Sequence, residues 1–484
     1  MPGSEDLFSF GVNQHGKTLG TPDDAVFDRL SGGGVRRRGL ADILDLAARR
    51  REEAAAEGKS FGMDAGEENA DPNDLRLAGW GVLFGRSVSA DIKKKLQPLL
   101  DLRQSQGANP FKIFEQGPRG QDEDVYQWMG DRGVSLNPVD PTLGVPYYLL
   151  IVAPPEDISF EFQYVLDIYW AVGRLWFDSV DEFAAYAQSV VAYEDPGHRP
   201  AQKRQVAMFA PEHDFDRATQ LFTSQVAKPL CGTETTDPIG KRLKYGLQPL
   251  LGARATKEGY RQILRGDIEG GPPALLFSGG HGMQFDSGDK SQLDTQGALV
   301  CQDWPSDGAI TPDHWFAAKD VPDDANMHGL MYFMFACHGG GVPQFDNYDR
   351  LNDAPRQIAP RAFFSKLPQA LLAHPGGGAL AVLAHIERAW AYGFQGDGGL
   401  PQIQGFRGVL ANLLRGDRIG QATDTFNMNW AANNVRLTDA QVARERDPAL
   451  PIAPIKRFWI RRDDARNFMV LGDPAVRLRV ADLA

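Results

Sequence analysis

The sequence predicts an α/β fold with a doubly wound, mostly parallel sheet, helices on both faces and an amino-terminal appendage. Apolar runs of strand length alternate with longer amphipathic segments along most of the 484 residues, which is typical of strands joined by crossover helices. The run at residues 147–153 is apolar throughout and flanked by prolines, as expected for a central parallel strand buried on both faces. Polar or glycine-rich turns follow several other apolar runs and mark where those strands end.

Hydrophobic periodicity assigns the elements in order. The expected strands are residues 79–84, 111–115, 147–153, 205–210, 274–280, 330–336, 378–384, 456–462, 468–472 and 476–480. The expected helices are residues 39–58, 89–106, 122–133, 162–174, 180–194 and 216–230. Ser89 is expected to be the N-cap of the second of these helices, and Pro98 is expected to kink or break it.

Changes in composition along the chain divide it into three regions. Residues 1–77 are the least regular and are interpreted as a regulatory segment or pro-segment. Residues 78–200 are expected to form a first α/β subdomain, and residues 201–484 a second one that carries the candidate catalytic groups.

The overall composition is that of a folded protein with a net negative charge. Apolar residues make up 42% and charged residues 24%, values ordinary for a globular chain. Lys and Arg (51) are outnumbered by Asp and Glu (63), and the resulting net charge of −12 disfavours nucleic acid and anionic membranes as partners.

Cysteine content and hydropathy indicate in which cellular compartment the protein is expected. Three cysteines are too few for a disulfide framework and fit a reducing compartment. The amino terminus has no basic stretch followed by an apolar run, and no window of about 18 residues is apolar throughout. We therefore expect a cytoplasmic protein that is neither exported nor membrane-spanning.

Three of the expected strands end in residues that can carry chemistry. His281 follows one strand in a glycine-rich turn, Cys337 follows another and precedes three glycines, and an acidic cluster at residues 212–216 follows a third. Catalytic groups collect beyond the carboxyl ends of parallel strands. A thiol needs a base, the base needs an acid that fixes its tautomer, and an oxyanion needs amide donors. These strand ends supply all of those groups.

Structural roles are the alternative for the same side chains. A cysteine at the end of an apolar strand is commonly an inert small hydrophobe, and a lone histidine is commonly a core residue. Their joint occurrence, each beside glycines that allow close backbone approach, favours a catalytic pair. Cys231 and Cys301 lack a glycine turn and are interpreted as structural.

A metal site is the competing use of these residues. His281, Cys337 and His338 would need further ligands, and no HExxH, CxxC or HxH spacing nominates them. A structural calcium in an acidic loop such as residues 286–294 stays open, although that loop lacks the closing glutamate of a helix–loop–helix site. We expect that catalysis requires no metal and no cofactor.

The same strand ends resemble those of the gingipain-type cysteine peptidases, caspase-like enzymes of clan CD that pair a His-Gly turn with a downstream Ala-Cys turn. Residues 145–158 resemble the family's central strand, residues 171–194 its Val-Gly-Arg segment and following helix, and residues 468–478 its Leu-Gly-Asp-Pro strand. The resemblance covers roughly residues 78–480 and implies a sheet of caspase/gingipain type.

The resemblance implies a role for each catalytic group. Cys337 would be the nucleophile and His281 the general base and acid. The backbone amides of Gly282 and Cys337 would form the oxyanion hole. Glu212 falls where the family has the acid that orients the histidine, within a residue or two.

The resemblance also implies cleavage after basic residues, with arginine preferred. Asp216, or its rival Asp214, would accept the guanidinium of the substrate, and Trp390 would line the pocket. The alternatives are an N-cap role for Asp216 and a core role for Trp390.

Two departures from the family suggest regulation. His281 and Cys337 are 56 residues apart, a longer separation than expected for the secreted members of the family. Residues 304–329 are therefore expected to form an inserted loop over the site. The missing export signal implies an intracellular protease that is controlled by its amino-terminal segment, by a protein partner or by cleavage. Arg36, Arg37 and Arg38 are candidates for self-cleavage or pocket blocking, with a solvated basic loop as the alternative.

The sequence thus predicts a bacterial-type cytoplasmic cysteine endopeptidase that acts on protein substrates. By analogy with intracellular relatives, it would act in stress, programmed cell death or antiviral defence. Two alternatives remain open at this stage: a catalytically inactive caspase-like scaffold or binding protein, and a hydrolase that uses the same dyad on a non-peptide acyl group.

Overall fold

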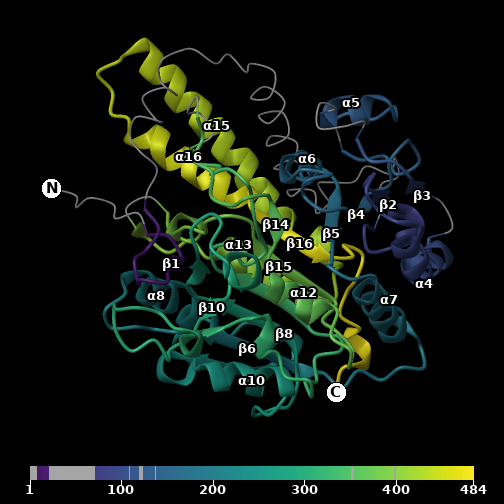
Figure 1. Cartoon of the computed structure of the whole chain (residues 1–484), viewed down its shortest axis with the longest axis horizontal. Helices are drawn as coiled ribbons and strands as arrows, with labels where there is room; N and C mark the ends of the chain where they lie inside the picture. The colour runs from purple at the N-terminus through teal and green to yellow at the C-terminus, as the bar shows by residue number, and fades with distance from the viewer. Residues whose placement is uncertain are drawn as a thin grey trace.

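A ten-stranded sheet forms the centre of the molecule (Figure 1). The computed structural model describes residues 8–20, 71–107, 110–118, 124–136, 138–349, 354–396 and 399–484. Among them the strand order of the large sheet is β3-β2-β4-β5-β16-β15-β12-β8-β6-β7. Its strands are β2 (Trp80–Phe84), β3 (Phe111–Phe114), β4 (Tyr148–Val152), β5 (Ala171–Leu175), β6 (Lys203–Ala210), β7 (Gly246–Leu251), β8 (Pro273–Gly279), β12 (Met331–Phe335), β15 (Ala381–His385) and β16 (Phe468–Gly472).

The sheet is mostly parallel. β3, β2, β4 and β5 pair in parallel, and so do β7, β6, β8, β12 and β15. β16 pairs with β15 in the antiparallel direction. Every residue of β4, β8, β12 and β15 is buried, so both faces of the sheet are covered, as expected for parallel strands.

Helices cover the sheet, and several pack in pairs. The helices are α3 (Leu75–Ala78), α4 (Ala90–Gln106), α5 (Val125–Gly130), α6 (Phe160–Leu166), α7 (Val180–Glu194), α8 (Arg217–Phe222), α9 (Lys228–Leu230), α10 (Lys257–Arg265), α11 (Gln292–Thr295), α12 (Lys366–Leu372), α13 (Gln404–Arg415), α14 (Ile419–Ala422), α15 (Asp424–Arg446) and α16 (Ala453–Arg466). A π-helical turn, Thr223–Ala227, joins α8 to α9. α4 packs on α7 and α15 on α16. None of the helices among the described residues is long and apolar enough to cross a membrane.

Local signals in the sequence explain where α4 begins. Ser89 caps the helix, because its Oγ accepts the backbone N–H of Ile92 at 3.3 Å. The expected break at Pro98 is wrong, since α4 continues through it. The proline ring lies on the exposed side, while the buried Leu96 and Leu99 beside it belong to the hydrophobic core and hold the helix in place.

Three expected elements are corrected. The helix expected at 162–174 ends at Leu166, and its last residues belong to β5. A Cβ at Gly173 would overlap the carbonyl oxygen of Gly472, so this close strand contact needs glycine. The strand expected at 456–462 lies inside α16, and residues 476–480 form no strand. A short run of apolar and basic residues fits the periodicity of a helix and that of a strand, and only packing decides between the two.

A smaller sheet, which the sequence did not predict, lies beside the large one. It comprises β1 (Gly11–Asn13), β9 (Gly282–Gln284), β10 (Leu299–Val300) and β11 (Trp315–Phe316), in the order β1-β9-β10-β11. β1 belongs to residues 8–20, here called the amino-terminal segment. Figure 1 shows β1 in purple close to α8 and far from β2, the next strand along the described chain. A two-stranded sheet pairs β13 (Gly341–Val342) with β14 (Phe363–Phe364).

The expected inserted loop is a folded part of this region. Residues 304–329 contain β11, and Trp304, Ile310 and Trp315 are buried in one cluster with Val12. The N–H of Ile310 donates to the carbonyl of Gln14 at 3.0 Å. The expected helix at 39–58 and the candidate cleavage site Arg36–Arg38 lie outside the described residues.

Candidate active site

Cys337 lies two residues beyond the end of β12 and is fully buried. Its Sγ accepts the N–H of Ala389 at 3.1 Å, and burial raises the pKa of the thiol. Its own N–H donates to the carbonyl oxygen of Phe10 at 2.9 Å. The strand end therefore fixes both the sulfur and the amide of this residue.

His281 lies two residues beyond β8, the strand next to β12. Its Nε2 lies 2.9 Å from Oδ2 of Asp216. Because an ionised carboxylate only accepts hydrogen bonds, the neutral ring of His281 carries its proton on Nε2 and its lone pair on Nδ1. That Nδ1 is buried and has no hydrogen-bond partner among the described residues. His281 is thus held in the tautomer that a general base needs.

Asp216 combines two functions at the start of α8. As the N-cap, its Oδ2 accepts the N–H of Thr219 at 2.8 Å and also the Nε2–H of His281. Burial by itself would raise the pKa of Asp216. The hydrogen bond from His281, the charge of that ring when it is protonated, and the hydrogen bonds from Thr219 outweigh burial and hold the pKa well below its ordinary value. The carboxylate is therefore ionised and already engaged.

The expected oxyanion donors converge on one atom. The N–H groups of Gly282 and Cys337 both donate to the carbonyl oxygen of Phe10, each at 2.9 Å. A Cβ at Gly282 would overlap the carbonyl oxygen of Cys337, so only glycine lets the two turns pack this closely. The structure brings together the two amides that the sequence proposed.

The structure places Glu212 away from His281. Both Glu212 carboxylate oxygens accept from Lys228 Nζ, at 3.0 and 3.1 Å. Asp214 is exposed, and its carbonyl accepts from Gln220 Nε2 at 2.8 Å. β6 ends at Ala210, and α8 begins after the cap residue Asp216. The acid that contacts His281 is therefore at the start of this helix and not directly after the strand. In the sequence, the Asp-x-x-Thr pattern at residues 216–219 indicates that Asp216 caps a helix.

Trp390 has a fully buried side chain. It packs with Tyr348 and with α16 residues Trp459 and Ile460. Its main chain forms an antiparallel bridge to Ser9 in the amino-terminal segment, so the structure supports the core role for its side chain.

An aromatic pocket, which the sequence analysis missed, lies next to the two catalytic turns. The ring of Phe10 is fully buried there, with ring centroids of Phe222, Phe335 and Phe394 at 5.9, 4.9 and 5.7 Å. The His281 ring centroid lies 6.1 Å from that of Phe10. The clustering of these phenylalanines comes from α8, β12 and the loop after β15, so no single stretch of sequence displays it.

The other two thiols lie elsewhere. Cys301 is fully buried, and Cys231 lies half-buried beside Met208. Burial raises the pKa of both, to about 11 for Cys231. All three cysteines are unpaired. In the part of the chain that the structure describes, no three His, Cys, Asp or Glu side chains form a cluster able to hold a metal ion.

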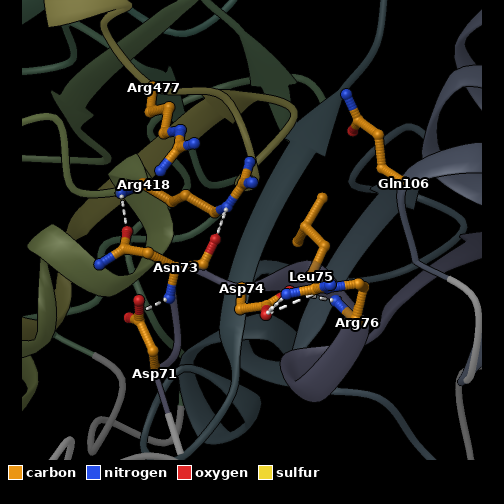
Figure 2. Close-up of a pocket in the computed structure, with 8 residues that line it drawn as sticks. All are labelled: Asp71, Asn73, Asp74, Leu75, Arg76, Gln106, Arg418 and Arg477. Atoms are coloured by element: carbon orange, nitrogen blue, oxygen red, sulfur yellow. Dashed lines mark hydrogen bonds and ion pairs between the residues drawn. The ribbon is translucent and has the colours of Figure 1, made fainter.

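A separate pocket of about 430 Å³ lies beside the start of α3 and the end of α4 (Figure 2). It is lined by Asp71, Asn73, Asp74, Leu75, Arg76, Gln106, Arg418 and Arg477. Arg418 is held there by Asn73, whose main-chain carbonyl accepts from Nε at 3.0 Å. The pocket contains none of the residues at the catalytic turns.

The family model of peptidase family C25 matches residues 89–479, which is most of the chain. The chain belongs to peptidase family C25, the gingipain family. It is a cysteine-type peptidase with a caspase-like α/β fold. The C25 match includes every element that carries Cys337, His281 and Asp216, and it leaves the amino-terminal segment outside.

Solved structures similar to this C25 peptidase include three of low sequence identity. Gingipain R, an Arg-specific cysteine proteinase, is 14% identical, with 86% of this chain and 80% of that chain covered and a TM-score of 0.48. A complex of pro- and mature domains from Porphyromonas gingivalis is 12% identical, with 83% and 80% covered and a TM-score of 0.41. The Saccharomyces cerevisiae separase–securin complex is 10% identical, with 94% and 22% covered and a TM-score of 0.30. At these identities the similarity concerns the fold. No curated protein sequence matches this chain significantly.

Proposed function

We propose that this C25 peptidase is an endopeptidase in which Cys337 attacks the substrate carbonyl and His281 acts as general base and acid. Asp216 is the positioning residue that holds His281, and the amides of Gly282 and Cys337 form the oxyanion hole. The observation that carries the proposal is the convergence of these two amides on a single peptide carbonyl, Phe10 O, beside the thiol.

The reaction follows from these positions. His281 Nδ1 takes the thiol proton, and the thiolate of Cys337 adds to the substrate carbonyl carbon. The oxyanion accepts the two N–H groups, and the tetrahedral intermediate collapses as the C–N bond breaks and His281 returns the proton to the leaving amine. Water, deprotonated by His281, then hydrolyses the thioester and releases the acid product and the thiol.

Cleavage after basic residues, with arginine preferred, depends on a carboxylate that is free to accept a guanidinium. Asp216 is engaged by His281, so cleavage after basic residues would have to use the exposed Asp214. It stays a prediction, and the aromatic surroundings of Phe10 compete with it. We also propose that the peptidase acts on protein substrates inside the cell, under regulation, without a cofactor. The three unpaired cysteines support a reducing compartment, and the amino-terminal segment on the catalytic turns supports regulation. Roles in stress, cell death or antiviral defence, and a regulatory partner or a structural calcium, stay predictions.

The test must first release the amino-terminal segment from the site. Gly11→Ala does so without changing a catalytic group, because a Cβ there would overlap Leu19 and lie 2.9 Å from the sulfur of Cys337. Fluorogenic peptides that differ only before the scissile bond are then offered to this variant, with and without Cys337→Ala. We expect hydrolysis to fall at least about a thousandfold when the thiol is removed.

Cys231→Ala serves as the matched control, and it should leave the rate unchanged. Absence of peptide hydrolysis together with absence of labelling of Cys337 by peptidyl electrophiles would contradict the proposal and leave a scaffold. Hydrolysis of simple thioesters without hydrolysis of peptides would identify an acyl hydrolase of another class.

A further inference from the structure

We propose that the pocket around the Phe10 ring is the primary specificity pocket of this peptidase, that it selects an aromatic residue before the scissile bond, and that Phe10–Gly11 is a built-in, substrate-like occupant. The inference rests on the proposed function and names the substrate class for the same site.

The carbonyl of Phe10 occupies the position of a scissile carbonyl. Its oxygen accepts the N–H groups of Gly282 and Cys337, each at 2.9 Å, which is the geometry required for an oxyanion hole. The next residue, Gly11, lies against the thiol, since a Cβ there would be 2.9 Å from Cys337 Sγ. The peptide bond that follows Phe10 therefore lies across the catalytic centre.

The residues before this bond are bound as an extended strand. The N–H of Phe10 donates to the carbonyl of Ala389 at 2.8 Å, and the N–H of Ala391 donates to the carbonyl of Phe8 at 2.9 Å. Ser9 pairs with Trp390 in the antiparallel direction. Addition of a strand to an exposed edge is a general way to bind peptides, since its main-chain hydrogen bonds do not depend on sequence. Sequence selection is left to the side-chain pocket.

That pocket is built for an aromatic ring. Phe10 makes edge-to-face contacts with Phe222, Phe335 and Phe394, and its side chain is fully buried. Asp216, the carboxylate that contacts His281, is engaged by His281 and Thr219. A guanidinium placed among these rings would lose its hydration and would not gain Asp216 as a partner, which disfavours arginine.

The residues after the bond anchor the occupant. Gly11–Asn13 pairs in parallel with β9, the strand that follows His281. Val12 is buried with Met283, Val300 and Trp304 in a separate hydrophobic cluster. Leu19 returns to donate its N–H to the carbonyl of Gly11 at 3.1 Å. Because the occupant belongs to the same chain, its effective concentration is high, and it excludes peptides from the site while it is seated.

The experiment compares the full-length wild type with Gly11→Ala, using Gly20→Ala as matched control, because a Cβ at Gly20 meets no atom within 4 Å. Each protein is treated with peptidyl acyloxymethyl ketones that carry Phe, Leu or Arg at the reacting position, and labelling of Cys337 is followed by mass spectrometry. We expect at least a tenfold faster labelling of Gly11→Ala than of the wild type, with Phe at least tenfold faster than Arg and no effect of Gly20→Ala.

Each other outcome has a defined meaning. Equal or faster labelling with Arg would overturn the aromatic pocket and leave the proposed peptidase intact. Equal labelling of wild type and Gly11→Ala would overturn the claim that Phe10–Gly11 occupies and blocks the site. Failure of all three probes on both proteins, with unchanged thermal unfolding, would overturn the proposed function and this inference with it.

A second pair of variants guards against misfolding of Gly11→Ala. Phe10→Leu should retain the occupant and label slowly, whereas Phe10→Arg should release it and label at least tenfold faster. The reverse order, slow for Phe10→Arg and fast for Phe10→Leu, would show that the pocket takes a basic side chain and would overturn the proposal.

Discussion

Nε2 of His281 lies 2.9 Å from Oδ2 of Asp216, and the same oxygen accepts the first-turn N–H of Thr219 in α8. The cap of a helix and the anchor of the histidine are therefore one carboxylate. This relationship assigns the positioning role to Asp216 and leaves Glu212 with Lys228.

Asp216→Asn should reduce kcat/KM by roughly 10²- to 10⁴-fold, because an amide can donate to Nε2 and favours the wrong tautomer of His281. The change should appear mainly in kcat, since the carboxylate acts through His281 and not directly on the substrate. Peptide hydrolysis by the Gly11→Ala chain with and without this substitution checks it.

Glu212→Gln is the matched control for Asp216→Asn and should stay within about threefold of the parent, because exposed ion pairs contribute little. A large loss for Glu212→Gln with a small one for Asp216→Asn would reverse the assignment. The pH profile adds a second readout, since loss of the anchor should shift the limb that reports on His281.

Gly282→Ala should lower kcat by roughly 10²- to 10³-fold, the range for loss of one oxyanion donor. A Cβ at this position would overlap the carbonyl oxygen of Cys337 and force the two turns apart. Gly130→Ala, where a Cβ meets no atom within 4 Å, should leave kcat unchanged. Full activity of Gly282→Ala would mean that the two amides do not act together.

Glu387 makes stability depend on pH near neutrality. The residue is buried, Oε1 lies 3.1 Å from Arg388 Nε, and Oε2 accepts the N–H of Asn347. Burial raises the pKa of Glu387 to about 7, despite the opposing charge of Arg388. Since the folded pKa lies above the unfolded one, the stabilisation is fully present below about pH 4.5 and is lost as pH rises through about 7.

Glu387→Gln should therefore flatten the pH dependence of unfolding. Between about pH 4.5 and 8, the wild type should lose on the order of 3 kcal/mol through this group. The variant should lack that component, and urea unfolding at several pH values measures the difference. Parallel curves for the two proteins would show that Glu387 ionises normally in the folded state.

Asp473→Ala should cost about 3–5 kcal/mol of unfolding free energy, because it leaves a buried guanidinium without one of its partners. Asp473 accepts from Arg103 Nε at 2.6 Å and from Trp80 Nε1 at 3.0 Å, and Arg103 is fully buried. Asp181→Ala, which breaks an exposed pair with Lys95, should cost under about 1 kcal/mol. Chemical denaturation compares the two, and equal costs would contradict the buried network.

The sequence predicted the parts of the fold that depend on local pattern. The predominantly apolar runs of β4, β8, β12 and β15 identified buried strands, because parallel strands covered on both faces need no polar side. β5 was missed since Ala-Val-Gly-Arg-Leu fits a helix or a strand, and only the contact of Gly173 with Gly472 distinguishes them. The basic, aromatic segment inside α16 was misassigned for the same reason.

The candidate site was predictable to a similar degree. Cys337 and His281 follow strands at glycine turns, so the expectation that they meet needed only a parallel sheet. Which acid of 212–216 reaches the histidine depends on how the chain turns into α8. The pairing of β1 with β9 joins segments that are remote in sequence, and no local periodicity records such a contact.

The place of β16 in the sheet has a consequence for biosynthesis. β16 lies between β5 and β15, although on the order of 300 residues separate β5 from β16 along the chain. A nascent polypeptide therefore exposes His281 and Cys337 before the sheet that supports them can close. We therefore expect peptidase competence only after residues 468–472 have been synthesised and have joined the sheet, which would spare the growing chain and its neighbours from proteolysis during translation.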